Sequence, residues 1–435
     1  MTRTLISGAR MLGDGAADLL IEDGVIAEVG SLRGTRADEV LDADGLVALP
    51  GLVDLHVHLR EPGREDAETI ATGSAAAAAG GYTAVFAMAN TSPVTDTAEA
   101  AERILDLGVA CGLVEVVPVG AVTHALAGER LAELGLMARS RARVRVFSDD
   151  GRCVHDARIM RRALEYIKPF GGVISQHAQD PRLADASACC HEGEVSGRLG
   201  LPGWPGIAEE SIVARDVMLA RHTGSRVHVA HVSTAGTVEV IRWAKAQGIA
   251  VTAEVTPHHL ALTTELLTGY DPVYKVNPPL RPAEDVEALR AGLADGTIDV
   301  VATDHAPHAR HDKEHAFVDA AFGMLGLETA LSVVSDVMVA TDRLDWAGVA
   351  RVMSSRPARI GGLTGQGQPL QVGSHANITL VDPDREVTVD AAASRSRSRN
   401  NPWDGRTLRG AVHTTIYRGR VTHGVDPRRT TETAQ

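Results

Sequence analysis

An apolar run ends in two histidines and an arginine at Pro50-Gly51-Leu52-Val53-Asp54-Leu55-His56-Val57-His58-Leu59-Arg60. In a β-strand successive side chains point to opposite faces, so His56 and His58 lie on the same side. Neutral imidazoles paired in this way are good ligands for zinc or a similar ion. A strand with two inward-facing polar residues would have the same pattern, so this segment alone leaves metal binding open.

Seven further apolar runs with strand character follow along the chain, separated by helix-like segments. The eight predicted strands are Gly51–Leu55, Thr83–Met88, Leu113–Val119, Val144–Phe147, Gly172–Ser175, Arg226–Ala230, Ala250–Ala253 and Ile298–Ala302. The predicted helices include Asp66–Ala79, Thr97–Leu107, Asp156–Ile167, Ala208–Arg221 and Ala235–Ala246. This alternation favours an α/β fold, a (β/α)8 TIM barrel over residues 51–364. The alternative is an open doubly wound sheet, but no Gly-x-Gly-x-x-Gly motif follows the first strand.

The two ends of the chain carry short strand-like pieces that are broken by Gly and Asp. These pieces are Thr4–Ile6, Ala17–Glu22, Val25–Val29, Leu46–Leu49, Ala376–Val381 and Val412–Tyr417. Each end is too short to fold alone, so we expect residues 1–50 and 365–435 to form one small flanking β-sandwich domain. The polar run Ser394-Arg395-Ser396-Arg397-Ser398-Arg399 is predicted to be a solvated loop.

Composition narrows the class of protein. A chain of 435 residues can bury a large core, and its formal net charge of −13 argues against nucleic acid or an anionic membrane as the main partner. The N-terminus lacks the apolar core of a signal peptide, and no stretch approaches a membrane-spanning helix. The four cysteines are sparse and lack zinc-knuckle spacing, so we expect a reduced, cytoplasmic protein.

Polar residues follow the predicted strands, at the face of a barrel where active sites are built. They include His56, His58, Asn90, Asp149, Asp150, His177, His231, Asp304 and His308. Each one alone could cap a helix or bond a backbone carbonyl. Four histidines and two aspartates at one rim, however, match the donors that zinc accepts. Six donors exceed the needs of one tetrahedral ion, so two metals that share a carboxylate are predicted.

These residues resemble the metal-ligand pattern of the amidohydrolase superfamily and, within it, the bacterial type I dihydroorotases. The motifs that carry the resemblance are Asp54-Leu55-His56-Val57-His58-Leu59-Arg60-Glu61-Pro62-Gly63, Met88-Ala89-Asn90-Thr91, Phe147-Ser148-Asp149-Asp150-Gly151, Lys275-Val276-Asn277-Pro278-Pro279-Leu280-Arg281 and Ala302-Thr303-Asp304-His305-Ala306-Pro307-His308. In hydantoinases and allantoinases the fourth strand supplies a bridging lysine, but this strand holds Arg143 and Arg145 instead. The type I pattern uses an aspartate just downstream, and its spacing to the other ligands favours Asp150 over Asp149.

The resemblance implies two zinc ions per chain and a role for each ligand. The ligands are His56, His58 and Asp304 for one ion, His177 and His231 for the other, and Asp150 as the bridge. The implied reaction is the reversible cyclisation of N-carbamoyl-L-aspartate to L-dihydroorotate in de novo pyrimidine biosynthesis. In the hydrolytic direction a hydroxide between the ions attacks the ring carbonyl. Asp304 would be the catalytic residue that carries the hydroxide proton to the leaving ring nitrogen.

The substrate carries a carboxylate, which needs a cationic or donor-rich clamp. Arg60 lies two residues beyond His58 and would bind this carboxylate. By the family resemblance, Asn90 and His308 complete the clamp and Asn277 binds the ring amide, although Asn-Pro-Pro is also a common loop sequence.

Two neighbouring histidines need a separate interpretation. His258 and His259 lie near the seventh strand, but the six donors leave them no vacancy, so we expect helix capping or support of the ligands. His305 follows a ligand and is expected to point away from the metals. The segment after His308 is a candidate for the loop that closes over the substrate.

Three hypotheses about function follow. The first is a dihydroorotase that acts on a small molecule as a homodimer, with association with aspartate transcarbamoylase left open. The second is another cyclic-amide hydrolase, an allantoinase or a hydantoinase with altered metal ligation. The third is a non-catalytic barrel that scaffolds aspartate transcarbamoylase, a role that has no use for six aligned donors.

Overall fold

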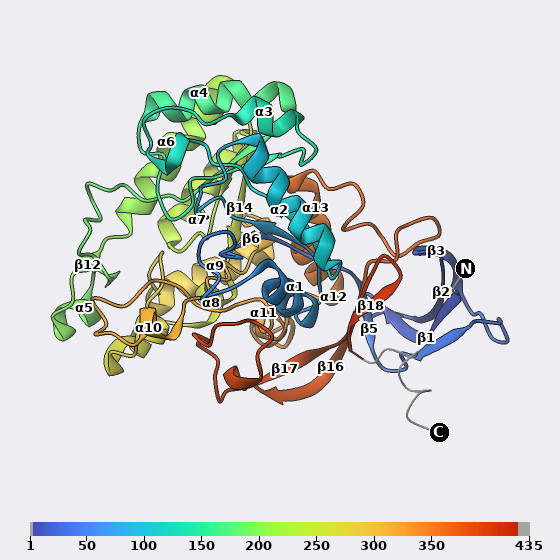
Figure 1. Cartoon of the computed structure of the whole chain (residues 1–435). Coiled ribbons are helices and arrows are strands. Elements are labelled where there is room, and N and C mark those ends of the chain that lie inside the picture. Colours follow the sequence, from blue (N-terminus) through green and yellow to red (C-terminus); the bar gives the residue numbers. More distant parts are fainter. Residues whose placement is uncertain (1–2, 425–435) are drawn as a thin grey trace.

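The computed structural model describes residues 3–424 of the chain (Figure 1). Positions 1–2 and 425–435 of the predicted end domain lie outside the described residues. Among residues 3–424, no helix is both long and apolar enough to cross a membrane.

All eight predicted strands of the central region are present, and they pair in parallel. One sheet has the order β6 (Leu52–Val57), β7 (Tyr82–Ala87) and β8 (Glu115–Pro118). The other sheet contains β15 (Val300–Val301), β14 (Val251–Val255), β13 (Val227–Val229), β10 (Val173–Gln176) and β9 (Val146–Phe147). Isolated parallel bridges join Gly120 to Phe147 and Val57 to His305, so each edge of the first sheet is linked to the second.

Helices cover these strands, and the five predicted ones are confirmed. They are α1 (Ile70–Ala79), α2 (Ala98–Cys111), α4 (Ala157–Ile167), α6 (Ile207–Thr223) and α7 (Ala235–Ala246). The others are α3 (Leu134–Arg139), α5 (Glu194–Leu199), α8 (Pro257–Ala261), α9 (Ala283–Asp295), α10 (Arg310–Lys313), α11 (Ala330–Val334), α12 (Trp346–Ala350) and α13 (Arg356–Gly361). A two-stranded parallel sheet, β11 (Cys190–His191) and β12 (Gly203–Trp204), lies in the connection before α6.

The helix α4 shows how the local sequence builds this layer. The Asp156 side chain caps its first turn by accepting hydrogen bonds from the backbone N–H groups of Arg158 and Ile159. The buried residues of α4 recur at helical spacing and pack on the core: Ile159, Met160, Ala163, Leu164 and Ile167.

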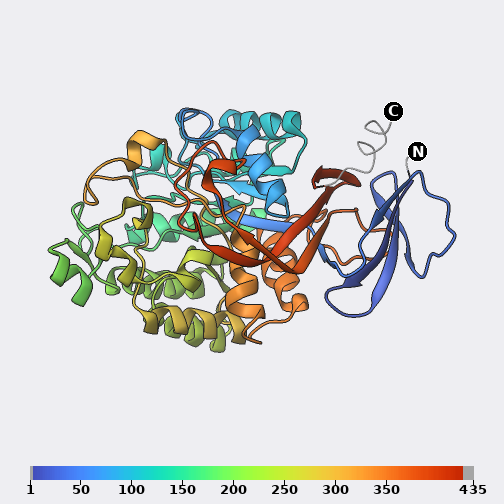
Figure 2. The same cartoon turned by 90° about the horizontal axis from the view of Figure 1, so that it is seen from below.

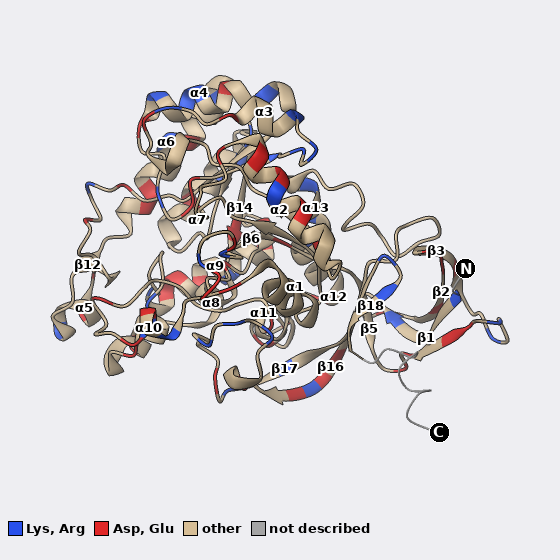
Figure 3. Cartoon of the chain, in the orientation of Figure 1, with Lys and Arg blue, Asp and Glu red and all other residues tan. Residues whose placement is uncertain are grey.

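The helix α1 differs from the prediction at its start, and it is covered by strands from the carboxyl-terminal end of the chain. It begins at Ile70 rather than Asp66, because the Thr69 hydroxyl caps the helix by accepting from the Thr72 N–H. The helix carries no charged residue, as Figure 3 shows, and a helix without a polar face must be covered. The carboxyl-terminal strands β17 (Thr407–Tyr417) and β18 (Arg420–His423) provide part of this cover, and the Thr415 hydroxyl donates to the Ala78 carbonyl at 2.7 Å.

Strands from both chain ends share one sheet. Its order is β18, β17, β16 (Ile378–Thr388), β5 (Val47–Pro50), β1 (Arg3–Met11), β2 (Ala16–Glu22) and β3 (Val25–Gly30), and β4 (Glu39–Asp42) pairs with β1. The antiparallel pair of β5 and β16 joins residues that are more than three hundred positions apart in the sequence. Figure 2 shows β16 and β17 running from the amino-terminal strands across to the α/β region.

The serine–arginine run is only half solvated, so the prediction of a solvated loop was wrong for its serines. Ser396 and Ser398 are buried while the intervening arginines are exposed. The Ser396 hydroxyl and the Arg397 N–H donate to the buried carboxylate of Glu68. The bends at residues 395–397 turn the Ser396 and Ser398 side chains inward and leave the arginines outside, which a reading of overall polarity does not reveal.

Candidate metal centre and substrate pocket

Six polar side chains at the carboxyl ends of the parallel strands form two groups of donors. One group contains His56, His58, Asp150 and Asp304. Each of these residues offers one ligand atom, and the four ligand atoms all lie within 4.8 Å of one another. The second group contains Asp150, His177 and His231 under the same criterion. All six residues are buried, and Asp150 belongs to both groups.

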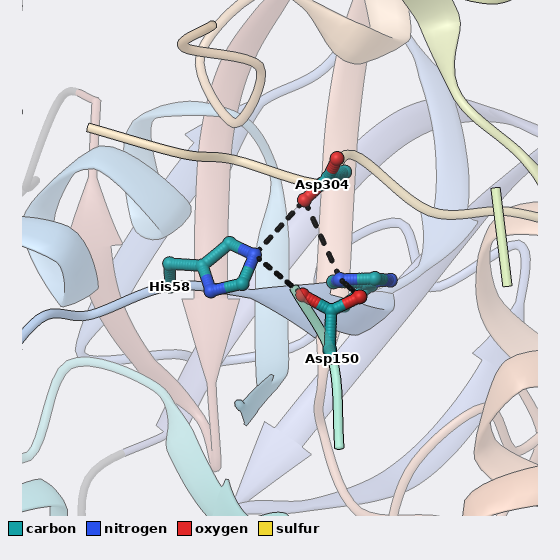
Figure 4. A group of neighbouring side chains, drawn as sticks. His58, Asp150 and Asp304 are labelled. Carbon is teal, nitrogen blue, oxygen red and sulfur yellow. Dashed lines mark hydrogen bonds and ion pairs between the residues drawn. The ribbon is translucent and has the colours of Figure 1, made fainter. Parts of the chain in front are cut away.

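The first group converges on the carboxylates of Asp150 and Asp304 (Figure 4). His58 Nε2 lies 3.0 Å from Asp304 Oδ1 and 3.3 Å from Asp150 Oδ2. His56 Nε2 lies 3.3 Å from Asp150 Oδ1 and 3.4 Å from Asp304 Oδ1. Both histidines come from β6 or its end, so the strand alternation predicted from the sequence does place them together.

The second group forms around the other side of Asp150. His177 Nδ1 and His231 Nε2 each lie 3.3 Å from Asp150 Oδ1. The two imidazole nitrogens are 2.9 Å apart. Asp150 is therefore the carboxylate that the two donor groups share.

The hydrogen-bond partners of the histidines fix which nitrogen is free to bind an ion. His56 Nδ1 lies 2.6 Å from Glu254 Oε1, and His58 Nδ1 lies 2.9 Å from Asn90 Oδ1. Since these oxygens accept, the neutral form of each ring has its proton on Nδ1, which leaves the Nε2 lone pair for an ion. Gln179 Oε1, 3.0 Å from His177 Nε2, selects the other tautomer there and leaves Nδ1 free.

These free lone pairs face carboxylate oxygens, an arrangement that fits a bound cation. A lone pair and a negative oxygen at about 3 Å repel each other unless a proton or a metal ion lies between them. His56 Nε2 is buried and has no hydrogen-bond partner among the described residues. The chemistry of the donor set, neutral imidazoles with ionised carboxylates, is the one that zinc and similar divalent ions prefer.

The electrostatics show the same need for positive charge between these atoms: burial lowers the pKa of His56, but the carboxylates of Asp150, Asp304 and Glu254 outweigh burial and raise this pKa well above its usual value. Burial raises the pKa of Asp304, but His56 and His58 outweigh this effect and hold the pKa at about 2. Burial likewise raises the pKa of Asp150, and the neighbouring histidines lower it well below the usual value. Both carboxylates are therefore ionised at neutral pH.

Glu254 supports the centre, and the sequence reading missed it. It lies on β14 with no exposed surface, and its carboxylate contacts His56 Nδ1 and, at 3.0 Å, His228 Nε2. Glu254 Oε1 also accepts from the His231 N–H at 3.2 Å. The sequence contained one sign of this role: Glu254 is the one charged residue of β14, and a carboxylate buried in a strand needs polar partners.

Asp149 has a different role from its neighbour. Its Oδ1 accepts from the backbone N–H groups of Val122 and Thr123 at 2.8 and 2.9 Å. Its Oδ2 accepts from the Thr123 hydroxyl. Asp149 therefore ties the loop after β8 to the end of β9, and it belongs to neither donor group.

Arg60 and His308 lie together beside the first donor group. Arg60 Nε donates to the Pro307 carbonyl at 3.0 Å, and Arg60 Nη2 lies 3.4 Å from His308 Nε2. Burial lowers the pKa of Arg60 to about 10, which leaves the guanidinium charged at neutral pH. His308 Nε2 donates to the Phe322 carbonyl at 2.7 Å, and burial with the nearby Arg60 lowers the His308 pKa to about 3.

Asn277 is linked to the second donor group. Its Nδ2 donates to Gln179 Oε1 at 3.3 Å, the same oxygen that contacts His177. Its Oδ1 is buried and lacks a hydrogen-bond partner among the described residues, so this amide oxygen is free to accept from a ligand.

The other histidines near the rim lie outside both groups. His259 contacts the Thr256 hydroxyl at 2.8 Å, and it is Thr256 that caps α8. His258 packs against His259, and its Nε2 is buried without a partner among the described residues. His305 points away from the donors, as predicted: its Nε2 lies 3.3 Å from Glu68 Oε2.

A third cluster contains Asp66, His311 and Asp312, with two of the three residues exposed. The guanidinium of Arg64 already pairs with both of its carboxylates. The chain itself thus supplies the positive charge at this position.

Known families match both halves of the chain. Residues 45–237 match the Dihydro-orotase-like family, and residues 208–422 match the Amidohydrolase family. The chain is 61% identical over 422 residues to a dihydroorotase of Streptomyces coelicolor, covering 97% of this chain and 98% of the relative. It is 58% identical over 420 residues to a dihydroorotase of Mycobacterium tuberculosis, covering 96% of this chain and 97% of the relative.

Solved structures of cyclic-amide hydrolases have a fold similar to that of this chain. An L-hydantoinase (dihydropyrimidinase) from Arthrobacter aurescens superposes with a TM-score of 0.85 at 27% identity, covering 98% of this chain and 96% of that one. A dihydropyrimidinase from Brevibacillus agri has a TM-score of 0.83 at 23% identity, covering 97% and 95% of the two chains. These matches indicate a TIM barrel with a β-rich domain. The chain belongs to the dihydroorotase family of amidohydrolases, enzymes that hydrolyse cyclic amides.

Proposed function

We propose that this enzyme is a dihydroorotase, which interconverts N-carbamoyl-L-aspartate and L-dihydroorotate in de novo pyrimidine biosynthesis. The observation that carries the proposal is the pair of donor groups that share Asp150, with the half-buried guanidinium of Arg60 beside them. The donor groups suit hydrolysis of a cyclic amide, and the guanidinium suits a substrate that also carries a carboxylate. The names of the relatives at 61% and 58% identity support the same reaction.

The metal assignment follows the two donor groups. Two zinc ions are proposed, one held by His56, His58 and Asp304 and one by His177 and His231, with Asp150 as the shared ligand. Such ions supply a nucleophilic water at neutral pH and polarise the carbonyl that it attacks. Glu254, Asn90 and Gln179 hold the imidazole tautomers that leave the correct nitrogens free.

Asp304 is proposed as the proton shuttle. Although burial raises its pKa, the neighbouring histidines keep Asp304 ionised in the resting site, so its carboxylate can accept a proton from the attacking water. In hydrolysis the same carboxyl group then delivers that proton to the departing ring nitrogen. In the biosynthetic direction it removes the proton from the carbamoyl nitrogen.

The substrate pocket is proposed to combine Arg60, Asn90, Asn277 and His308. The guanidinium of Arg60 donates to the substrate carboxylate, and its half-buried position strengthens that charge-assisted bond. The free Oδ1 of Asn277 accepts from a ring N–H. His308, whose Nε2 proton is used by Phe322, shapes the clamp beside Arg60 as a neutral ring.

Several finer assignments belong to the same proposal. We infer that the two parallel sheets close into one (β/α)8 barrel over residues 51–364, with a β-sandwich built from the described parts of the two chain ends, residues 3–50 and 365–424. The bridges at both edges of the three-stranded sheet support the closure. A cytoplasmic homodimer, with or without aspartate transcarbamoylase, is the assembly we propose.

A hydantoinase is the second candidate, because hydantoinases are among the structural neighbours. Two features favour a dihydroorotase instead. The fourth strand has no lysine, and the carboxylate of Asp150 lies where a bridging group is needed. A simple hydantoin also offers no carboxylate to Arg60.

The purified enzyme is expected to contain zinc and to hydrolyse L-dihydroorotate much faster than hydantoin. Chelation should abolish this activity and added zinc should restore it, since zinc supplies the nucleophile. Metal analysis paired with assays on both substrates checks the prediction. Turnover of hydantoin without turnover of dihydroorotate would refute it, and so would full activity in metal-free protein.

Arg60→Ala is expected to raise KM for dihydroorotate by at least about thirtyfold, because a half-buried charged partner of the carboxylate is lost. Steady-state kinetics in both directions measure the effect. Arg64→Ala is the matched control, since Arg64 lies in the same loop but is exposed and pairs with Asp66 and Asp312. An equal KM in the two variants would exclude Arg60 from the clamp.

A further inference from the structure

Lys313 is a half-buried lysine whose ammonium bonds only to backbone carbonyls. Its Nζ donates to the carbonyls of Ala321 at 2.8 Å, Gly323 at 3.1 Å and Lys275 at 3.3 Å. An ammonium has three donors, so its hydrogen-bonding capacity is used in full. Among residues 3–424, no carboxylate lies within the 4.0 Å of an ion pair with Lys313.

The three carbonyls belong to two segments that border the proposed substrate pocket. Lys275 lies two residues before Asn277, and its carbonyl also accepts from the Gly323 N–H at 2.9 Å. Ala321 and Gly323 flank Phe322, whose carbonyl accepts from His308 Nε2 at 2.7 Å. Lys313 therefore fixes the peptide units on both sides of the residue that orients the His308 ring.

Other contacts hold the same segment from its opposite sides. Lys275 Nζ lies 4.3 Å from the centre of the Phe322 ring, a cation–π contact. The Asn400 amide donates to the Gly323 carbonyl at 3.1 Å and to the Ala306 carbonyl at 2.9 Å. Lys313 joins α10 to both the 321–323 segment and Lys275, and the Asp312 carbonyl of α10 accepts from the Ala321 N–H at 3.0 Å.

Burying this amine is costly, which argues for a specific use. Desolvation, together with the nearby Lys275, lowers the pKa of Lys313 to about 7. A lysine on a short exposed helix could extend into water at no such cost, as the neighbouring Arg310 does. The three carbonyl contacts offset part of this loss of hydration, because they satisfy every donor of the ammonium.

We propose that Lys313 is a positioning residue of the substrate pocket, which holds segment 321–323 against Lys275 and so sets the His308 ring and the Asn277 amide. The proposal rests on the proposed function, since the pocket is the one assigned to dihydroorotate. Lys313 itself touches no reacting atom in this scheme.

Lys313→Met tests the proposal, because methionine keeps the apolar stem and removes the three donors. KM for dihydroorotate is expected to rise about tenfold to a hundredfold, the effect of losing charged hydrogen bonds, while kcat changes much less. Hydrogen exchange measured by mass spectrometry should be faster in peptides that cover 321–323 and 275–277. Zinc content should equal that of the wild type.

Arg242→Met is the control, since it removes one positive charge at an exposed helix position that does not line the cavity beside His308. It should leave KM and the exchange of both segments unchanged. If Lys313→Met behaves like this control, the inference is wrong; if its kcat falls with an unchanged KM, the positioning role is also excluded. Lys313→Gln, which is polar but too short to reach the carbonyls, replaces the methionine variant if that variant does not fold.

The wild-type enzyme, assayed in parallel, distinguishes a failure of the proposed function from a failure of the positioning role. A wild type that does not turn over dihydroorotate refutes the proposed function. An active wild type with an unaltered Lys313→Met variant refutes the positioning role alone. The exchange measurement needs no substrate, so it reports on segment 321–323 in either case.

Discussion

Asp304→Asn is expected to lower kcat for dihydroorotate hydrolysis by about a thousandfold or more, at the upper end of what general acid/base catalysis provides. The asparagine keeps the volume of the side chain but cannot accept and return a proton. Rate measurements in both directions should show the same loss, because one carboxyl group serves both. Zinc content and thermal stability, measured on the same preparation, show whether kcat falls because proton transfer is lost or because the variant loses metal or unfolds.

The choice of asparagine follows from the backbone. Asp304 has a φ of 46°, in the left-handed region that asparagine tolerates better than alanine. The substitution also removes one of two neighbouring negative charges, since Asp150 and Asp304 both contact His56 and His58. The variant should therefore fold. A fully metallated Asp304→Asn enzyme with near wild-type kcat would rule out the shuttle.

The strands and the donor groups could be predicted from the sequence because both follow from local rules. A strand alternates its side chains, so His56 and His58 had to share a face. In a parallel α/β fold the strands end at a common rim, so residues such as His177, His231 and Asp304 were expected to converge. Neither rule needs knowledge of distant contacts.

The supporting residues could not be found in this way, because their partners are far away in the sequence. Glu254 gains its role from His56 and His228 on other strands. Lys313 gains its role from carbonyls at positions 275, 321 and 323, and backbone carbonyls carry no sequence signal. The buried serines of the serine–arginine run depend on Glu68, a residue more than three hundred positions away.

Asp149 and Asp150 are adjacent aspartates with different expected effects. Asp150→Asn should lose zinc from both positions, because the amide lacks the negative charge and second oxygen that a shared ligand needs. The loss of metal affinity should exceed the factor of about 10 to 100 typical of a supporting hydrogen bond. Metal analysis after dialysis against a weak chelator measures it, and kcat should fall with the metal content.

Asp149→Asn is the matched control, one position away and with the same chemical change. Its Oδ1 can still accept from Val122 and Thr123, so the loop after β8 should hold with a loss of about 1–3 kcal/mol in the free energy of unfolding. Zinc content should stay at the wild-type level. Equal zinc contents in the two variants would exclude Asp150 as the shared ligand.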